Sequence, residues 1–314
     1  MKIMQTVDVI IPVYRPGQEL LSLLEQLQSQ TLQPDRIILY NTEEKLFLDF
    51  AQKQNLTERF PNVSVFHHTK QEFDHGMTRN RGVSKSQAEI FVMMTMDAVP
   101  ADSFLLERLV AALLQEEKIA VAYARQLPNE TCREIEKYTR SFNYPEVSRI
   151  KTAKDEAELG IKTYFCSNVC AAYKRDVFDA LGGFIKHTIF NEDMIYAGRA
   201  VKQGYAICYA ADAKVIHSHN YTNGQQFHRN FDLGVSQTDH PEVFAGLASE
   251  SEGIKLVLNT QKHLIRTHHM GEIFRLYTSS AAKLLGYKLG RNYQKLPKWL
   301  IYRCTMNREY WDMQ

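Results

Sequence analysis

The sequence predicts an α/β protein with a mainly parallel central sheet and a helical C-terminal appendage. Over the first part of the chain, short apolar runs alternate with segments of helical periodicity, the pattern of strands joined by helical crossovers. From about Gly253 onward the pattern changes to helices with little strand character. With 314 residues the chain is long enough for one large domain and a smaller appendage. We therefore expect a domain over residues 1–250 and a helical region over 251–314.

Five short apolar runs predict the strands, and helical segments separate most of them. Leucines spaced three and four residues apart predict a helix over 20–27, and a second helical segment covers 104–114. Ligands of such sheets bind beyond the carboxyl ends of the strands. Polar residues are therefore expected to form a site after Val13, Tyr40, Phe66 and Thr95. The predicted strands are 7–13, 36–40, 63–66, 89–95 and 119–123.

Composition excludes several classes of function. A net charge of +2 gives no electrostatic footprint for nucleic acid. The five cysteines include no C-x-x-C pair, so neither a zinc site nor a disulfide framework is indicated. A strand-like run already begins at Val7, which leaves no room for a signal peptide, and every apolar run is far shorter than the ~20 residues that span a bilayer. We expect a cytoplasmic protein without a transmembrane span.

Asp97 is the first candidate for chemistry, because it directly follows a buried strand. An ionised carboxylate there is costly unless it is paired or bound to a cation. Oxygen ligands suit Mg²⁺ or Mn²⁺, so a metal is expected. An N-cap for the next helix is the alternative, although Asp102 is better placed for that. His217 and His219 follow another strand-like run, where H-x-H spacing puts both rings on one side. They suit a metal or a phosphate, with structural histidines as the alternative.

Two further segments combine groups that suit a phosphorylated ligand and acid–base chemistry. Residues 73–82 contain two arginines and two glycines on the expected ligand side, which favours phosphate contact over a solvated loop. Glu192 and Asp193 open an amphipathic helix. Acids at a helix start also complement the macrodipole, but one carboxylate cannot both hold a metal and remove a proton, so a second is required if Asp97 is a ligand.

These segments together resemble glycosyltransferase family 2, and within it the rhamnosyltransferase-like group of bacterial polysaccharide synthesis. The resemblance covers essentially the whole chain. It implies a GT-A fold, a nucleotide-sugar part over about 1–125 and an acceptor part over about 126–250. The segments that carry it are VIIPVY at 9–14, FDHG at 73–76, TRN at 78–80, TMDAVP at 95–100, YARQLP at 123–128, SN at 167–168, GGF at 182–184, ED at 192–193, HSH at 217–219, KLLGYKLG at 283–290 and LP at 296–297.

The resemblance also implies a role for each site residue. Asp193 would act as the general base beside Glu192. Asp97 would ligate Mg²⁺ or Mn²⁺, with His217 and His219 as further ligands. The acceptor would contact Ser167, Asn168 and Arg229. The nucleotide sugar would contact Pro12, Tyr14, Glu43, Asp74, His75, Arg79, Thr95 and Met96.

The sequence departs from the family pattern in three places. The usual Asp-Asp after the second strand is replaced by Asn-Thr-Glu-Glu at 41–44, which puts base contacts there in question. The usual Asp-x-Asp keeps only Asp97, with Thr95 in the other place, so weaker metal binding is expected. The segment 226–230 resembles the Q-x-x-R-W of processive synthases without its tryptophan, which favours addition of a single sugar.

The activity implied is inverting transfer of L-rhamnose from dTDP-L-rhamnose to a lipid-linked or oligosaccharide acceptor in cell-surface polysaccharide synthesis. A UDP-hexose or UDP-HexNAc transferase of the same fold is one alternative, and a non-catalytic nucleotide-sugar-binding subunit is another. A nucleotidyltransferase would require a glycine- and lysine-rich loop after the first strand, which residues 14–17 do not supply.

The C-terminal segment 283–314 has a composition of its own. Seven lysines and arginines stand there against Glu309 and Asp312, with six tyrosines and tryptophans interleaved. A basic, aromatic-rich helical segment suits the surface of an anionic membrane. The alternative is a helix packed on the catalytic domain or on a partner subunit, which includes a homodimer.

Overall fold

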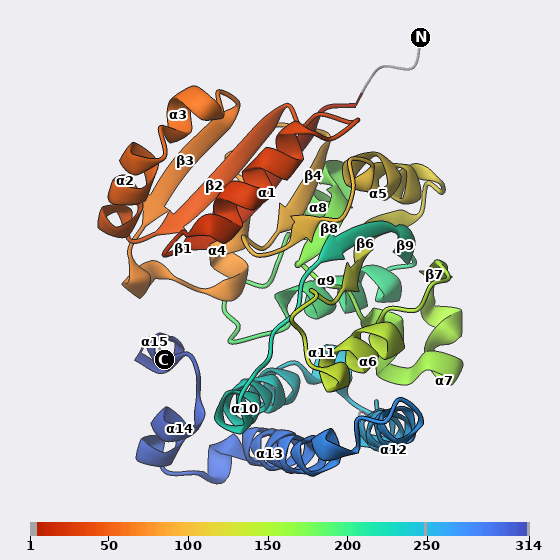
Figure 1. Ribbon diagram of the computed structural model, residues 1–314. Helices are drawn as coiled ribbons and strands as arrows, with labels where there is room; N and C mark the ends of the chain where they lie inside the picture. The colour runs from red at the N-terminus through yellow and green to blue at the C-terminus, as the bar shows by residue number, and fades with distance from the viewer. Residues whose placement is uncertain (1–4, 248–249, 313–314) are drawn as a thin grey trace.

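The computed structural model describes residues 5–247 and 250–312 and has one mixed β-sheet flanked by helices (Figure 1). Within these residues the strands form a nine-stranded sheet of order β3-β2-β1-β4-β8-β6-β9-β5, with β7 paired to β9. The strands are β1 Val7–Tyr14, β2 Arg36–Thr42, β3 Val63–His68, β4 Ile90–Met94, β5 Val99–Pro100, β6 Ile119–Leu127, β7 Arg149–Lys151, β8 Cys170–Lys174 and β9 Ala206–Ile216.

Helices connect the strands and form a further layer at the C-terminus. The α-helices are α1 Gln18–Gln28, α2 Glu44–Lys53, α3 Leu56–Arg59, α4 His75–Val83, α5 Leu105–Leu114, α6 Glu134–Asn143, α7 Glu156–Leu159, α8 Arg175–Ala180, α9 Glu192–Lys202, α10 Asn223–Asp239, α11 Pro241–Phe244, α12 Glu250–Arg266, α13 Ile273–Arg291, α14 Lys298–Cys304 and α15 Arg308–Asp312. Short 3₁₀ helices are η1 Lys70–Glu72, η2 Ala153–Asp155, η3 Gly160–Tyr164, η4 Met270–Glu272 and η5 Tyr293–Lys295.

The sheet is parallel in its first half and mixed in its second. Strands β3, β2, β1 and β4 are all parallel, as the alternation of apolar runs and helices predicts. Strand β8 then pairs antiparallel with both β4 and β6, and β6 pairs parallel with β9. The five predicted strands are confirmed as β1, β2, β3, β4 and β6, and the expected α/β fold with a mostly parallel sheet is confirmed. The short strands β5, β7 and β8 were not predicted, since they carry no long β-branched run.

Both faces of the sheet are covered, which explains why its strands are continuous apolar runs. In β1, Val9 and Ile11 point to one side and pack in the same cluster as leucines of α1 and α5. Ile10 points to the other side, where it packs in a cluster with residues of α4, α8 and α9. Side chains alternate along a strand with period two, so the long central strands β1, β4 and β6 contribute to both clusters.

A third cluster holds the C-terminal helices together beneath the sheet (Figure 1). It joins Phe231 and Val235 of α10 to Ile301 and Cys304 of α14. The predicted helical C-terminal region is thus confirmed. The domain boundary at residue 250 stays a prediction; α10, which precedes it, already packs along α13, and residues 248–249 lie outside the described residues.

Glycines allow α10 and α13 to pack in backbone contact. A Cβ at Gly286 would lie 2.1 Å from the carbonyl oxygen of Phe227, and one at Gly290 would lie 2.1 Å from that of Phe231. Only residues without a side chain permit such an approach. The two glycines of the K-L-L-G-Y-K-L-G segment are therefore explained by this helix–helix contact.

Two further features of the structure are the state of its cysteines and the length and apolar character of its helices. All five cysteines are buried, and each is a free thiol. Among the described residues, no helix has both the length and the apolar character that crossing a bilayer demands.

The close contact of α10 and α13 gives a first prediction. Replacing Gly286 by valine forces side-chain atoms into the Phe227 carbonyl, and we expect a loss of about 2–3 kcal/mol in the free energy of unfolding, measured with denaturant. Gly271→Val is the matched control, because a Cβ there meets no atom within 4 Å, and it should stay within about 0.5 kcal/mol of the parent. Equal unfolding midpoints for the two variants would contradict this packing.

Candidate active site

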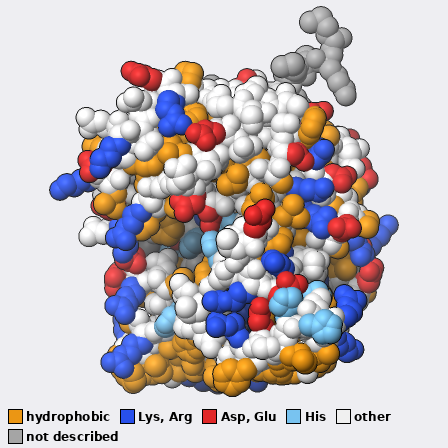
Figure 2. Space-filling model, in the orientation of Figure 1, with side chains coloured by type: hydrophobic (Ala, Val, Ile, Leu, Met, Phe, Trp, Pro, Cys, Tyr) orange, Lys and Arg blue, Asp and Glu red, His pale blue; other side chains and the backbone are white. Residues whose placement is uncertain are grey.

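A cavity of about 460 Å³ opens where the carboxyl ends of several strands converge. Asp97 reaches it from the loop after β4, Gln126 from the end of β6 and His217 from just beyond β9. Helices α6, α9 and α10 contribute the remaining walls. Figure 2 shows this face of the molecule hollowed between the sheet and the C-terminal helices. The position agrees with the rule that ligands of such sheets bind beyond the carboxyl strand ends.

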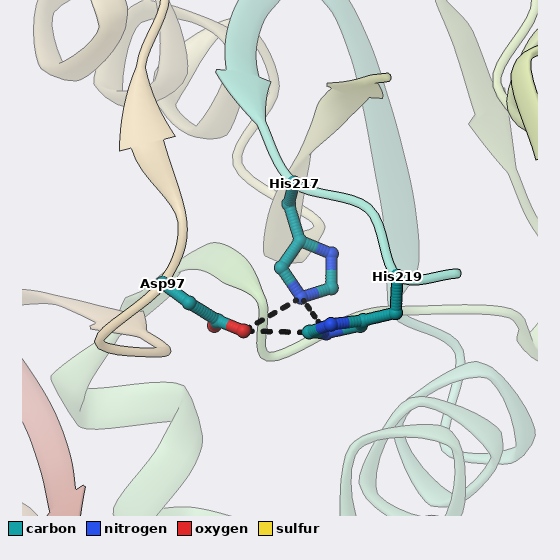
Figure 3. A group of neighbouring side chains, drawn as sticks. All are labelled: Asp97, His217 and His219. Carbon is teal, nitrogen blue, oxygen red and sulfur yellow. Dashed lines mark hydrogen bonds and ion pairs between the residues drawn. The ribbon is translucent and has the colours of Figure 1, made fainter. Parts of the chain in front are cut away.

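Asp97, His217 and His219 point their polar atoms at one spot in this cavity (Figure 3). The Asp97 Oδ2 atom lies 3.5 Å from His217 Nε2 and 3.2 Å from His219 Nε2. The two Nε2 atoms are 3.1 Å apart. Burial alone would raise the pKa of Asp97, but the two imidazoles outweigh it and hold that pKa well below its usual range. Asp97 is therefore a carboxylate.

A hydrogen bond to Gln126 determines which ring nitrogen of His217 faces Asp97 and His219. His217 Nδ1 lies 3.1 Å from Gln126 Oε1, and the Arg140 guanidinium donates to that same oxygen. The Gln126 amide nitrogen in turn donates to the Ser167 hydroxyl at 3.0 Å. Because arginine only donates, Oε1 is an acceptor, and His217 must carry its proton on Nδ1. A neutral His217 then presents the Nε2 lone pair to Asp97.

This arrangement fits a divalent cation. With its proton on Nδ1, a neutral His217 directs its Nε2 lone pair at the spot that Asp97 also faces, so a cation placed there would contact both groups. One carboxylate and two imidazoles, with the far nitrogen of one ring held by a hydrogen bond, is a common metal-ligand set. The two imidazoles favour Mn²⁺ over Mg²⁺, which takes oxygen ligands and keeps several waters.

A second acidic group lies at the start of α9, across the cavity wall. Glu192 forms a buried ion pair with Arg79, with its Oε1 atom 3.1 Å from Nε, and also accepts from the Asn168 amide at 3.1 Å. Asp193 accepts from the Asn168 backbone N–H at 2.9 Å through Oδ2. The Asn168 Oδ1 atom accepts from the Tyr173 hydroxyl at 2.6 Å. Asn168 thus positions both acids.

The two neighbouring acids differ in protonation. Burial raises the pKa of Glu192, but the charges of Arg79 and His75 and the hydrogen bond from Asn168 together outweigh burial, and the net pKa is lowered. Burial and then the negative charge of Glu192 raise the pKa of Asp193 to about 7. Paired acids whose environments separate their pKa values divide into a permanently ionised group and one that exchanges protons near neutrality. We therefore expect Asp193 to be the member that exchanges protons.

Most of the residues predicted for the site line this one cavity, while five do not. The five outside it are Pro12, Tyr14, Glu43, Asp74 and Met96, and their proposed nucleotide contacts stay predictions. The predicted residues that line the cavity are His75, Arg79, Thr95, Asp97, Ser167, Asn168, Glu192, Asp193, His217, His219 and Arg229.

Asp74 has a structural task in this chain. Its Oδ1 atom accepts from the backbone N–H groups of Gly76 and Met77 at 2.9 and 2.8 Å, and Oδ2 accepts from that of Thr188 at 3.1 Å. It is the N-cap of α4, and it ties that helix to the loop before α9. Through this cap, Asp74 orients the helix that carries Arg79.

Three of the residues predicted to contact the nucleotide sugar lie in or just after β1 and β2. Pro12 is within β1, and Tyr14 is its exposed last residue. Glu43 follows β2 with a φ of 68° and accepts from the Lys70 backbone N–H at 2.5 Å. Strand β1 pairs with β4, which leads to Asp97, and β2 lies on the other side of β1.

Sequence reasoning missed Glu136 and Arg140 of α6 and Tyr221, all of which line the cavity. Arg140 pairs with Glu136, Nε to Oε1 2.7 Å, while donating to Gln126. Gln126 carried a signal, since it lies in the YARQLP segment at 123–128, just beyond the predicted strand 119–123. Nothing in the sequence marks Arg140, because the orientation of α6 is set by tertiary packing.

Solved structures of similar shape support the fold. The chain aligns with the mannosyltransferase PcManGT from Pyrobaculum calidifontis in complex with GDP-Man and Mn²⁺ at a TM-score of 0.57 and 16% identity, over 98% of this chain and 86% of that one. It also aligns with residues 1–349 of S. aureus TarS in complex with UDP-GlcNAc, at a TM-score of 0.51 and 14% identity, over 92% of each chain. These likenesses establish the GT-A fold.

Relatives in sequence are closer. The chain is 36% identical over 310 residues to the O-antigen chain rhamnosyltransferase RfbN of Salmonella typhimurium, covering 98% of this chain and 96% of the relative. It is 35% identical over 314 residues to the O-antigen chain rhamnosyltransferase WbaN of Salmonella anatum, with the same coverage. The model of glycosyl transferase family 2 matches residues 8–182. With its fold, its strand-end cavity and these relatives in agreement, the chain belongs to glycosyltransferase family 2.

Proposed function

We propose that this protein transfers L-rhamnose from dTDP-L-rhamnose, with inversion, to a saccharide acceptor in cell-surface polysaccharide synthesis. The observation that carries the proposal is the presence in one cavity of a cation-binding group, Asp97 with two histidines, and of Asp193, an acid that exchanges protons near neutrality. The choice of sugar rests on the two O-antigen rhamnosyltransferases, each of which aligns over nearly the full chain.

Asp97, His217 and His219 would hold Mn²⁺ or Mg²⁺, and Mn²⁺ is the ion named with the mannosyltransferase PcManGT. When bound, the ion supplies positive charge to the leaving diphosphate. Arg79 lines the same cavity with Glu192 behind it. The ion pair keeps the guanidinium in place, so it adds to the stabilisation of the developing negative charge at no cost of reorganisation.

Asp193 would act as the base. It takes the proton from an acceptor hydroxyl, whose oxygen forms a bond to the anomeric carbon while the bond from that carbon to the diphosphate oxygen breaks. The electron pair of the broken bond leaves on dTDP. Because attack comes from the face opposite the leaving group, this single displacement inverts the anomeric configuration.

The acceptor would lie against α6 and α10. Arg229 is 4.6 Å from the centre of the Phe190 ring and 5.9 Å from that of Tyr221, which gives the cavity a flat, partly aromatic wall. The Ser167 hydroxyl and Glu136 offer hydrogen-bonding groups nearby. We propose a lipid-linked or free oligosaccharide as the acceptor, and peripheral contact of the protein with the inner face of the cell membrane.

Donor identity is tested by protection against thermal unfolding. With Mn²⁺ present, dTDP-L-rhamnose should raise the Tm more than UDP-galactose, UDP-glucose or UDP-GlcNAc at equal concentration, because only a bound ligand stabilises the folded state. Slow hydrolysis of the same donor should accompany binding. A larger shift with any UDP-sugar would replace the proposed donor, and no shift or hydrolysis with any of the four would reject transfer itself.

The role of Asp193 gives a pH prediction. A base must be deprotonated to accept a proton, so kcat/KM should rise with pH through a value of about 7, the pKa of Asp193. Asp193→Asn should lower kcat by at least about 10²-fold and leave the Kd for the donor within about two-fold. Asp179→Asn, at an exposed position of α8, serves as the control and should behave like the parent. A variant at Asp193 that keeps its turnover would remove this residue from the mechanism.

The hydrogen bond from His217 to Gln126 gives a prediction for metal binding. Gln126→Leu removes the acceptor that fixes the His217 ring. Loss of the hydrogen-bond partner of a metal-binding histidine weakens metal affinity by about 10–100-fold. Titration calorimetry with Mn²⁺ would measure this. Gln115→Leu is the control, because Gln115 bonds to Cys208 near the opposite end of β6, and its Mn²⁺ affinity should match that of the parent. Unchanged affinity in Gln126→Leu would separate this glutamine from the metal site.

A further inference from the structure

The C-terminal helices present a continuous apolar face to solvent. Figure 2 shows hydrophobic side chains along the lower edge of the molecule, where Figure 1 places α12, α13 and α14. Phe274 is 81% exposed and Trp299 is 61% exposed. We call this surface the apolar face; its residues are Ile254, Leu258, Ile265, Met270, Phe274, Tyr277, Leu284, Leu285 and Trp299.

The spacing shows that the apolar face is organised. On α13, Leu284 follows Tyr277 by about two turns and Leu285 follows Phe274 by about three turns, so these side chains form one stripe along the helix. The opposite side of α13, with Leu276 and the two glycines, packs inward. The helix is thus apolar on both sides. Single exposed apolar residues are ordinary, but contiguous patches of this kind mark sites of interaction.

Positively charged residues are also concentrated in the C-terminal helices. Residues 253–312 contain eleven lysines and arginines and three acidic residues, while the rest of the chain contains 27 basic and 33 acidic residues. A basic helical layer therefore lies under an acidic body. The helices that carry the apolar face also carry exposed basic residues; they include Lys262, Arg266, Arg275, Lys288, Lys298 and Arg303.

We propose that the apolar face docks the protein on an anionic lipid bilayer. Apolar side chains entering the interface and lysines and arginines at the headgroup level are the combination that holds amphipathic helices on such membranes. A second copy of the chain fits less well. A two-fold contact would bring the basic helices of both copies together, and like charges facing one another oppose association.

The apolar face coincides only in part with the segment 283–314, for which the sequence predicts membrane contact. Of the aromatic residues in the segment 283–314, Tyr310 is in the third core cluster, and Tyr293 and Trp311 pack against it. Trp299 stays exposed. The membrane contact therefore centres on α12 and α13, largely before the basic, aromatic-rich segment, with Trp299 added from α14.

Vesicle flotation tests this directly, and it uses no sugar nucleotide, so its outcome is independent of the proposed transferase activity. The full chain should float with vesicles of phosphatidylcholine containing about one third phosphatidylglycerol, and much less with phosphatidylcholine alone. Raising the salt concentration should release it, because screening weakens the electrostatic part. Failure to float with the anionic vesicles at low salt would overturn the proposal.

Variants locate the contact. Phe274→Ser combined with Leu285→Ser should lower the partition coefficient at least about ten-fold, since each side chain loses its transfer into the bilayer. The matched control is Leu46→Ser with Leu48→Ser, two exposed leucines of α2, which should bind as the parent does. Donor hydrolysis and Tm, measured in solution, should be unchanged in both variants. Equal flotation of the two double variants would overturn the assignment to the apolar face.

Light scattering after gel filtration separates lipid from protein as the occupant. A monomeric parent that floats with anionic vesicles supports membrane docking. A parent dimer that the Phe274/Leu285 variant converts to a monomer would show instead that the apolar face joins two copies, and would overturn the proposal.

Discussion

The buried ion pair between Arg79 and Glu192 is the interaction on which the rest of the active site depends. It joins α4 to α9, two helices from opposite halves of the chain. Breaking a buried pair leaves an uncompensated charge, so it fixes these helices relative to one another. It also keeps Glu192 ionised, and that negative charge helps to raise the pKa of its neighbour Asp193. One contact thereby serves both the position of Arg79, the arginine proposed to face the diphosphate, and the raised pKa of Asp193, the proposed base.

The mixed sheet explains how the cation-binding group is assembled. Strand β4 delivers Asp97, whereas β9 delivers both histidines from about 120 residues further along the chain. Strands β8 and β6 lie between them in the sheet, and β8 runs antiparallel, so the carboxyl ends of β4, β6 and β9 all open on the same cavity. Gln126 at the end of β6 then hydrogen-bonds to His217, although the two residues lie far apart in the sequence.

A division of charge runs through the whole molecule. The acidic body carries the catalytic cavity, and the basic helical layer is held to it by the glycine contacts of α10 with α13 and by the third core cluster. These contacts use one side of α13 only, which leaves its other apolar side exposed. The same packing that places Arg229 in the cavity wall, where we propose the acceptor binds, therefore creates the face proposed to meet the membrane.

The strands with long apolar runs, the strand-end position of the site and the importance of Asp97 could all be predicted from the sequence, because periodicity and the cost of a carboxylate after a buried strand are local properties. Asp193 was singled out by the resemblance to the family. Only the tertiary structure decided that Asp74 caps α4, that Arg140 and Gln126 orient His217, and that α13 leaves Phe274 exposed. Each of these depends on which groups from distant segments come within hydrogen-bond or packing distance. The sequence of α13 shows apolar residues on two sides of the helix. Which of the two sides is buried depends on the helix that packs against it.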